Sequence, residues 1–249
     1  MEGSAIDEVE LHGHSGPALP VFATPTLINA DFSRCVVVEP DRYHWTASPQ
    51  SGVERMMLDR IGDEKARATS IVRYAPASSF PLHAHPGGEE IFVLSGVFSD
   101  EHGDYPAGWY LRNPPQSSHR PHTVGGAIIF VKLRQISASD NRTVRIDTNR
   151  VTAWYRTGSR DICPLFFNEA EHVAMHRLNP RETLFKGPVN TAELLVTGGM
   201  LVAGEHRYCR GTWMRFPTSA GAWPDLVAGD TGASVYLKTG HLTLVRYKV

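Results

Sequence analysis

Residues 80–96 read FPLHAHPGGEEIFVLSG and combine two histidines, two glutamates and an apolar run. His83 and His85 alternate by two residues, so on a β-strand both side chains point to the same face. A Pro-Gly-Gly turn separates them from Glu89 and Glu90, and an apolar run ending in Ser-Gly follows. Imidazole nitrogens and a carboxylate at the mouth of a strand are ligands that suit a divalent transition metal.

A second block supplies a third histidine. Five residues separate Gly108 from Pro114, and His119 follows in the segment PPQSSH, with His122 three residues later. A His-x-His pair alone, such as the one at residues 12–14, is best explained as solvated surface histidines. The pair at 83 and 85 comes with a carboxylate and a further histidine block, and this combination predicts a metal site.

The chain contains an internal repeat. The segment GAIIFVKL (126–133) matches GASVYLKT (232–239) after a three-residue insertion. A shift of 103 residues brings the other landmarks together: Glu90 with Glu193, Gly96 with Gly199, Gly108 with Gly211, and Pro114 with Pro217. Residues that cannot coordinate a metal stand at the ligand positions of the second copy: Lys186, Pro188, Ala192 and Ala222. We therefore expect the second copy to keep the fold and to lack the metal.

The fold class follows from short apolar runs bounded by Gly, Pro, Asn and Asp. Segments such as 68–75, 90–98 and 127–133 are rich in β-branched and aromatic residues, which favours strands joined by turns. We predict an all-β protein of two tandem barrels. Residues 54–67 fit either a helix or a strand-loop-strand unit. The predicted organisation is a flexible N-terminal arm (1–21), a metal-binding domain (22–136), a linker (137–143) and a second domain (144–249).

Composition excludes several classes of function. The chain has 249 residues, of which 41% are hydrophobic and 20% charged, and its net charge is −1 with neutral histidines. No basic bias or polybasic run suggests a nucleic-acid partner or a membrane surface. The N-terminus lacks the basic and apolar regions of a signal peptide, and the three cysteines form no CxxC pair. We expect a cytoplasmic protein with free thiols.

The spacings of the two blocks resemble the two cupin motifs, G(x)5HxH(x)3–4E(x)6G and G(x)5PxG(x)2H(x)3N. The wider text of residues 30–136 is similar to the ChrR-type cupins, which include the C-terminal domain of ChrR anti-sigma factors and relatives of acetylacetone-cleaving dioxygenase; residues 144–249 resemble them loosely. The resemblance implies double-stranded β-helix (jelly-roll) barrels. It also implies one metal ion per chain, bound by His83, His85, Glu89 and His119.

Two ligand assignments have competitors. Glu90 also satisfies the motif spacing, but only Glu89 is separated from Gly96 by the six intervening residues of the motif, and Glu90 has a counterpart in the copy without ligands. His122 competes with His119, but only His119 has the spacing of the second motif. The chain departs from the motifs where Ala77 and Gln116 replace glycines and Thr123 replaces an asparagine. None of these three is a ligand, so they bear on turn geometry.

The resemblance implies two classes of function. The first is a cupin-type dioxygenase, an oxidoreductase that uses iron to cleave a small enolisable carbonyl compound such as a β-diketone. Fe²⁺ is the favoured metal, with Zn²⁺, Ni²⁺ and Mn²⁺ as alternatives. The second is a non-enzymatic regulatory or sensor cupin, although the chain lacks the CxxC-containing zinc motif of the anti-sigma factors. The expected partners are a small-molecule substrate or ligand and a second copy of the chain, in a homodimer.

Several residues around the motifs are candidates for the substrate pocket. Ile91 and Val93 share the strand face of Glu89 by alternation and should line the barrel. His122 and Phe130 are close to the motifs in sequence. Arg112 could hold an anionic substrate beside the metal, or it could form a surface ion pair.

Overall fold

The computed structural model describes residues 26–187, 189–217 and 223–242. The predicted arm at residues 1–21, together with Pro188 and Ala222, lies outside this part of the chain. The described residues form strands and loops, with two short 3-10 turns at Pro40–Arg42 (η1) and Val151–Ala153 (η2). The predicted all-β class is confirmed. No described helix is long and apolar enough to cross a membrane.

The first sheet contains nine strands in the order β1-β4-β5-β11-β7-β9-β12, with β3 paired to β4 and β8 to β7. Two further strands, β6 and β10, pair only with each other. The strands are β1 (Leu27–Ile28), β3 (Trp45–Ala47), β4 (Val53–Ile61), β5 (Arg67–Tyr74), β6 (His83–His85), β7 (Glu89–Asp100), β8 (Gly103–Pro106), β9 (Trp109–Asn113), β10 (Ser117–His119), β11 (Ala127–Leu133) and β12 (Val144–Asp147). Residues 54–67 thus form a strand-loop-strand unit.

The second sheet contains eight strands in the order β13-β14-β15-β19-β16-β18-β2, with β17 paired to β16. Its strands are β2 (Val36–Val38), β13 (Tyr155–Thr157), β14 (Arg160–Phe167), β15 (His172–Leu178), β16 (Ala192–Ala203), β17 (His206–Cys209), β18 (Trp213–Phe216) and β19 (Val227–Thr239). The order β14-β15-β19-β16-β18 repeats the order β4-β5-β11-β7-β9. The internal repeat in the sequence is therefore a repeat of strand topology.

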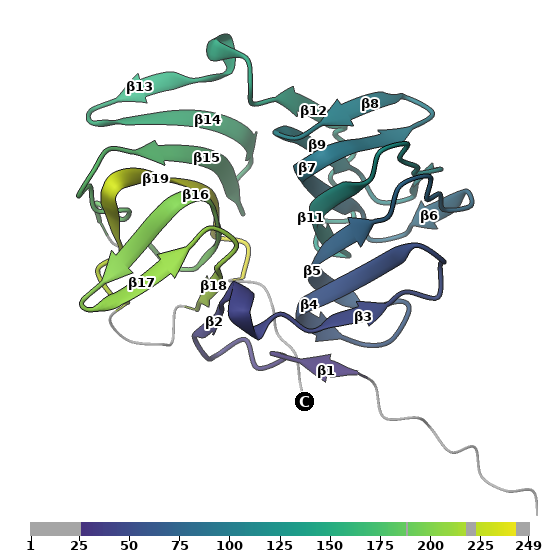
Figure 1. Cartoon of the computed structure of the whole chain (residues 1–249), viewed down its shortest axis with the longest axis horizontal. Helices are drawn as coiled ribbons and strands as arrows, with labels where there is room; N and C mark the ends of the chain where they lie inside the picture. Colours follow the sequence, from purple (N-terminus) through teal and green to yellow (C-terminus); the bar gives the residue numbers. More distant parts are fainter. Residues whose placement is uncertain (1–25, 188, 218–222, 243–249) are drawn as a thin grey trace, which may run out of the picture.

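Each sheet accepts its last strand from the other part of the chain. Strand β12 follows the predicted linker but pairs with β9, and β2 lies between β1 and β3 of the first sheet in the sequence but pairs with β18. Figure 1 shows the two sheets side by side, with β2 next to β18 and β12 next to β9. Both exchanged strands cover a sheet edge that would otherwise expose unpaired backbone groups.

The glycines shared by the two copies answer a steric requirement. Gly96 has φ +70°, and a Cβ there would lie 2.1 Å from the carbonyl oxygen of Gly126. Gly199 has φ +62°, and its Cβ would lie 2.2 Å from the oxygen of Gly232. The backbone of β7 approaches the start of β11 closely at this point, and the backbone of β16 approaches β19 in the same way. Because no side chain fits between them, both copies need glycine at this position.

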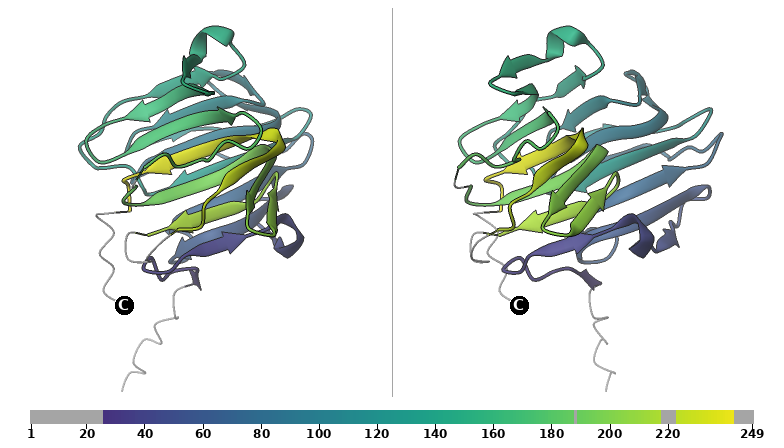
Figure 2. Two further views of the ribbon diagram at one scale, coloured as in Figure 1. Left: turned by 90° about the vertical axis from the view of Figure 1, so that its left-hand side faces the viewer. Right: turned by 60° about the vertical axis from the view of Figure 1, so that its left-hand side comes forward.

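Apolar side chains form three layers. One fills the first barrel and includes Ile91, Val93 and Ile129. A second fills the second barrel. The third lies between the sheets, where Phe92 and Phe130 meet Trp213 and Tyr236. Figure 2 shows the two sheets stacked face to face. Because both faces of β7 are buried, alternation sends its side chains to two different environments, and this division positions the candidate site.

Candidate metal centre

The three histidines lie on one face of a two-stranded ribbon. Strands β6 and β10 are antiparallel, with His83 opposite His119 and His85 opposite Ser117. Since side chains alternate along a strand, His83, His85 and His119 all point to the same side. Their ring nitrogens lie within 4.8 Å of one another. This is the one such cluster of three or more potential metal ligands in the part of the chain that the structure describes.

Glu89 completes the group. The Nε2 atoms of His85 and His119 lie 3.1 Å apart, and Glu89 Oε2 is 3.5 Å from the first and 3.3 Å from the second. The turn between His85 and Glu89 is closed by a hydrogen bond from the backbone N–H of Gly88 to the His85 carbonyl at 3.0 Å. Gly88 has φ +73°, and a Cβ there would press against Ile136 at 2.8 Å.

Alternation along β7 separates the two competing glutamates. Glu89 pairs in register with Asn113 and faces the histidines, whereas Glu90 pairs with Arg112 and faces the layer between the sheets. The Glu90 carboxylate accepts hydrogen bonds from Arg112 at 2.9 Å and from Lys238 at 2.7 Å, and burial leaves it 2% exposed. Of the two, Glu89 is the carboxylate that lies beside the histidines.

Neighbouring groups orient the cluster. The Nδ1 atom of His119 lies 3.3 Å from Asp100 Oδ2, and the Nδ1 atom of His83 lies 3.0 Å from the Pro81 carbonyl oxygen. With Nδ1 donating to these acceptors, the Nε2 atoms are left as electron-pair donors, which is the usual arrangement around a metal-binding histidine. The amide of Asn113 donates to Glu89 Oε2 at 3.0 Å.

The electrostatics of the cluster are mixed. Burial lowers the pKa of His85, which favours the neutral ring that a metal requires. Burial also acts to lower the pKa of His119, but the hydrogen bond to Asp100 and the charge of Glu89 outweigh it and raise that pKa. Burial opposes the ionisation of Glu89, yet His85, His119 and the Asn113 hydrogen bond hold the pKa of its carboxyl below the usual value.

The departures from the glycine pattern do not change the turns. Ala77 has φ +58° and Gln116 has φ +69°, so both adopt the left-handed conformation that glycine favours. The backbone N–H of Gln116 donates to the His85 carbonyl at 2.9 Å, and that of Ala77 donates to the Val124 carbonyl at 3.0 Å. The loops around the histidines are therefore held in a conformation that costs about 1–2 kcal/mol per non-glycine residue.

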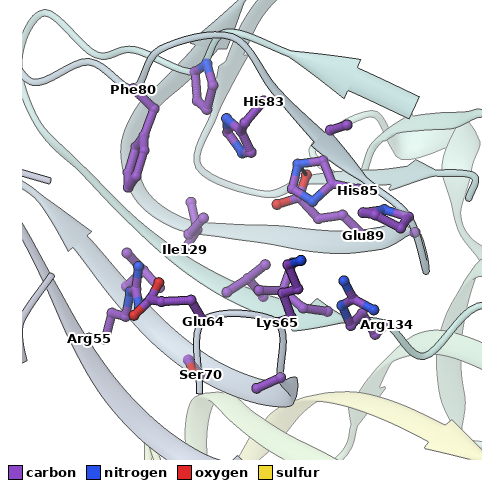
Figure 3. A pocket seen from close by; sticks show the side chains of 18 of the residues that line it. Arg55, Glu64, Lys65, Ser70, Phe80, His83, His85, Glu89, Ile129 and Arg134 are labelled. Atoms are coloured by element: carbon purple, nitrogen blue, oxygen red, sulfur yellow. Dashed lines mark ion pairs between the residues drawn. The ribbon is translucent and has the colours of Figure 1, made fainter. Parts of the chain in front are cut away.

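The cluster opens onto a pocket of about 400 Å³ in the first barrel. Part of the wall is apolar and comes from the inner faces of β5 and β11, including Val72, Ile129 and Val131. Figure 3 shows His83, His85 and Glu89 on one side of the pocket and charged side chains on the other. These charged residues are Arg55, Arg60, Glu64, Lys65 and Arg134.

The other predicted pocket residues are divided between locations. Ile91 and Val93 pack in the interior of the first barrel, as alternation predicted, although neither lines the pocket. Phe130 belongs to the layer between the sheets, because its strand neighbours Ile129 and Val131 take the inner face. His122 pairs with Ser99 through two backbone hydrogen bonds and does not line the pocket.

Arg112 does not reach the pocket. Its side chain is fully buried between the sheets, where it donates to Glu90 at 2.9 Å and Glu171 at 2.5 Å and lies over the ring of Phe166. Arg112 therefore forms ion pairs, but they are buried between the sheets and not on the surface as the alternative from the sequence expected. The physical reason is its register with Glu90, which places both residues on the face of the sheet opposite Glu89.

The described ligand positions of the second copy have other roles. Lys186 donates to Glu182 at 3.1 Å, and Ala192 is fully buried at the start of β16. Apolar side chains such as Leu194, Val196 and Met214 fill the interior of this barrel.

Sequence reasoning missed Asp100, Lys65 and Arg134. Alternation places residues 89, 91 and 93 inside the barrel, but the register between β7 and β11 shifts by one residue at Ile128/Ile129. After this bulge the even-numbered positions face inward, so Asp100 reaches His119. Lys65 and Arg134 lie in loops, and no periodic signal marks a loop residue that enters a pocket.

Comparisons with known proteins agree with the geometry. Residues 33–137 match the family described as the ChrR cupin-like domain. No curated protein matched the chain significantly. A candidate dioxygenase from Nostoc punctiforme is similar in structure, with a TM-score of 0.66, 14% identity, and 87% of this chain and 88% of that chain covered.

Two further structures show the same fold at low identity. The pirin YhhW from Escherichia coli, solved in complex with nickel(II), has a TM-score of 0.61 at 9% identity, covering 83% of this chain and 98% of its own. Oxalate decarboxylase from Bacillus subtilis has a TM-score of 0.53 at 13% identity, covering 82% of this chain and 76% of its own. At these identities the similarity establishes the fold alone.

Proposed function

We propose that residues 33–137, which match the ChrR cupin-like domain family, bind one divalent transition metal and oxidise a small enolisable carbonyl compound with dioxygen. The proposed ligands are His83, His85, Glu89 and His119, and the favoured metal is Fe²⁺. The observation that carries the proposal is the cluster of three imidazoles, with the Glu89 carboxylate beside His85 and His119, at the end of a pocket large enough for a small organic molecule.

The spacing of the donor atoms fits a shared ion. Two ligands bound to one metal at about 2.1 Å lie about 3.0–3.4 Å apart, depending on whether the angle is right or tetrahedral. The separations of 3.1, 3.3 and 3.5 Å among His85, His119 and Glu89 fall close to this range.

A bound Fe²⁺ would supply Lewis acidity toward a chelating enolate and the electrons that activate dioxygen. The protein contributes the geometry around it. Asp100 fixes the ring of His119, and Asn113 fixes the carboxylate of Glu89. Val72, Ile129 and Val131 provide an apolar wall that excludes water from part of the pocket, which strengthens electrostatic interactions with a bound substrate.

The test is oxygen consumption by the reconstituted protein. The metal-free chain is loaded anaerobically with Fe²⁺, mixed with a panel of β-diketones, and then exposed to oxygen. We expect oxygen uptake matched to substrate loss in the wild type, and loss of both in His119→Ala with an unchanged circular dichroism spectrum. His44→Ala, which changes a histidine that does not line the pocket, is the control and should remain active.

One experimental outcome would favour a regulatory or sensor function over the enzymatic one. A protein that binds one equivalent of metal, turns over no member of the panel, and changes its oligomeric state when the metal is chelated would be a regulatory cupin. Full metal content in the double variant His83→Ala/His85→Ala would overturn both readings, because neither functions without this site.

A further inference from the structure

The pocket beside the candidate metal centre carries an excess of positive charge. Four cationic side chains line it, Arg55, Arg60, Lys65 and Arg134, against two carboxylates, Glu64 and Glu89. Glu89 faces the histidines. A cationic side chain can bind an anionic ligand only if its charge is not already paired within the protein.

Two of the four have partners within the protein. Arg55 lies 3.7 Å from Glu64, which neutralises part of its charge. Arg60 is buried and spends its guanidinium on backbone carbonyls, donating from Nε to Gly62 at 2.9 Å and from a terminal nitrogen to Asp63. These contacts stabilise the turn that follows β4, so Arg60 is part of the wall.

Lys65 and Arg134 are the cations left over. Within the described ranges, neither has an acidic side chain within 4.0 Å or a hydrogen bond from its charged group. Lys65 comes from the loop between β4 and β5, and Arg134 follows directly after β11. Figure 3 shows both side chains in the pocket.

The position of Arg134 is tied to the proposed metal ligands. Leu133 lies opposite Glu89 in the pairing of β11 with β7. Arg134, the next residue along the chain, is therefore one position away from the residue that faces this proposed ligand. Its backbone N–H donates to the Gly88 carbonyl at 3.1 Å, and it has φ +57°. A Cβ on Gly87 would lie 2.8 Å from its Cα, so the glycine leaves room for the arginine.

A non-glycine residue in the left-handed region costs about 1–2 kcal/mol, and such strain concentrates at functional sites. Here the conformation has an identifiable result, because it turns the chain after β11 so that Arg134 lines the pocket instead of continuing the strand direction. Arginine is also the side chain whose planar guanidinium matches a carboxylate through two parallel hydrogen bonds.

We propose that the pocket selects a carboxylate-bearing substrate, with the carboxylate on Arg134 and Lys65 and the enolisable carbonyl group toward the histidines. This inference rests on the proposed function for the location of the carbonyl end. The charge balance supports it: a divalent ion and Glu89 leave one positive charge, to which Lys65 and Arg134 add two. A neutral diketone would offer a counter-charge to neither the exposed Lys65 nor the half-buried Arg134.

The experiment compares two ligands that differ in one group. Acetylacetone and 2,4-dioxopentanoate share the β-diketone unit, and only the second bears a carboxylate. Binding is measured by titration calorimetry on the full chain loaded with Zn²⁺, which does not support oxidation. We expect the carboxylate-bearing ligand to bind at least about tenfold more tightly, with a preference that weakens as ionic strength rises.

Variants locate the preference. Arg134→Asn removes the cation but keeps a residue that tolerates a positive φ, and Lys65→Gln removes the second cation. Each should weaken binding of 2,4-dioxopentanoate about tenfold and leave acetylacetone unchanged, whereas Arg134→Lys should retain part of the affinity. Arg207→Asn is the matched control, since Arg207 is an exposed residue of β17 in the second sheet, and it should have no effect.

The two proposals fail in different ways. Equal affinity for the two ligands, or a loss in Arg134→Asn that affects both equally, would overturn the carboxylate assignment even if the protein consumes oxygen. Retention of the anion preference without any turnover by the Fe²⁺ form would uphold the assignment and reject the oxygenase. The metal-free chain provides an independent reading, in which salt-sensitive binding of 2,4-dioxopentanoate should persist weakly and disappear in Arg134→Asn.

Discussion

Lys132 of the first sheet donates to both carboxylate oxygens of Glu193 in the second sheet at 2.5 Å. The reciprocal pair joins Lys238 to Glu90 at 2.7 Å. Lys132 and Lys238 occupy the same position in the repeat, as do Glu90 and Glu193, so each copy supplies a lysine to the glutamate of the other. Burial opposes ionisation of Glu193, but Lys132 and His241 hold the pKa of its carboxyl well below the usual value. These contacts join the two barrels into one unit.

Removing one member of such a pair should strongly destabilise the protein. Glu193 also accepts a hydrogen bond from the indole of Trp213 at 2.9 Å. Glu193→Gln leaves the Lys132 ammonium buried without a counter-charge, and we expect the free energy of unfolding to fall by about 3–5 kcal/mol. The measurement is urea denaturation followed by tryptophan fluorescence.

An exposed pair provides the control for this substitution. Arg181 and Asp230 lie 3.0 Å apart with about four-fifths of each side chain exposed to solvent. Asp230→Asn makes the same carboxylate-to-amide change and should cost less than about 1 kcal/mol. Equal losses in the two variants would show that burial does not govern the strength of the Lys132–Glu193 pair.

Asp100 should act as a positioning residue for His119. Asp100→Asn keeps the shape of the side chain but removes the charge that orients the imidazole, so the affinity for a divalent metal should fall about 10–100-fold. Competition with a chelator of known affinity measures this. One equivalent of metal should still bind at saturation, since all four proposed ligands remain. Unchanged affinity would mean that the 3.3 Å contact does not tune the site.

The left-handed turn at Ala77 predicts a stabilising substitution. Ala77→Gly relieves the steric cost of φ +58° at an exposed position, and this gain exceeds the larger conformational entropy of glycine in the unfolded chain. We expect the free energy of unfolding to rise by about 0.5–1 kcal/mol. Ala107→Gly, at a position without a positive φ, should be neutral or destabilising, and the reverse order of the two variants would contradict the conformational argument.

A histidine in the second sheet should make stability depend on pH. Burial, aided by the Arg160 charge, lowers the pKa of His176 to about 4, and its Nδ1 atom has no hydrogen-bond partner among the described residues. The unfolded chain therefore binds a proton below about pH 6.5 that the folded chain takes up only near pH 4. The contribution of His176 to stability should be complete above pH 6.5 and fall by about 3 kcal/mol as the pH is lowered to 4.

His176→Leu isolates this contribution. The variant has no titrating group at this position, so it should lose less stability than the wild type between pH 7 and pH 4.5, with both proteins metal-free. Parallel stability curves for the two proteins would show that His176 titrates equally in the folded and unfolded states. Burial acts to raise the pKa of the neighbouring Glu182, but hydrogen bonds from Ser159, Arg160 and Lys186 outweigh it and hold that pKa at about 2. Glu182 therefore contributes to the pH dependence of stability only at lower pH.

The spacing of the proposed ligands and the repeat of the strand order could be predicted from the sequence, because both depend on local geometry. The His-x-His spacing and the Pro-Gly-Gly turn are sufficient to bring His83, His85 and Glu89 together, because strand alternation and a tight turn act over a few residues. The repeat predicted the shared strand order, and it paired Glu90 with Glu193, each of which accepts a hydrogen bond from a lysine of the other copy.

The sequence did not predict which face of each strand is buried, or which strands and loops cover that face. Arg112 is adjacent in sequence to Asn113, whose amide reaches Glu89, yet the register of Arg112 with Glu90 buries it between the sheets. A bulge reverses the alternation before Asp100, and the loops carrying Lys65 and Arg134 meet at a pocket although they are far apart in the chain. Register, bulges and sheet stacking arise from contacts between distant segments, so no local pattern of residues specifies them.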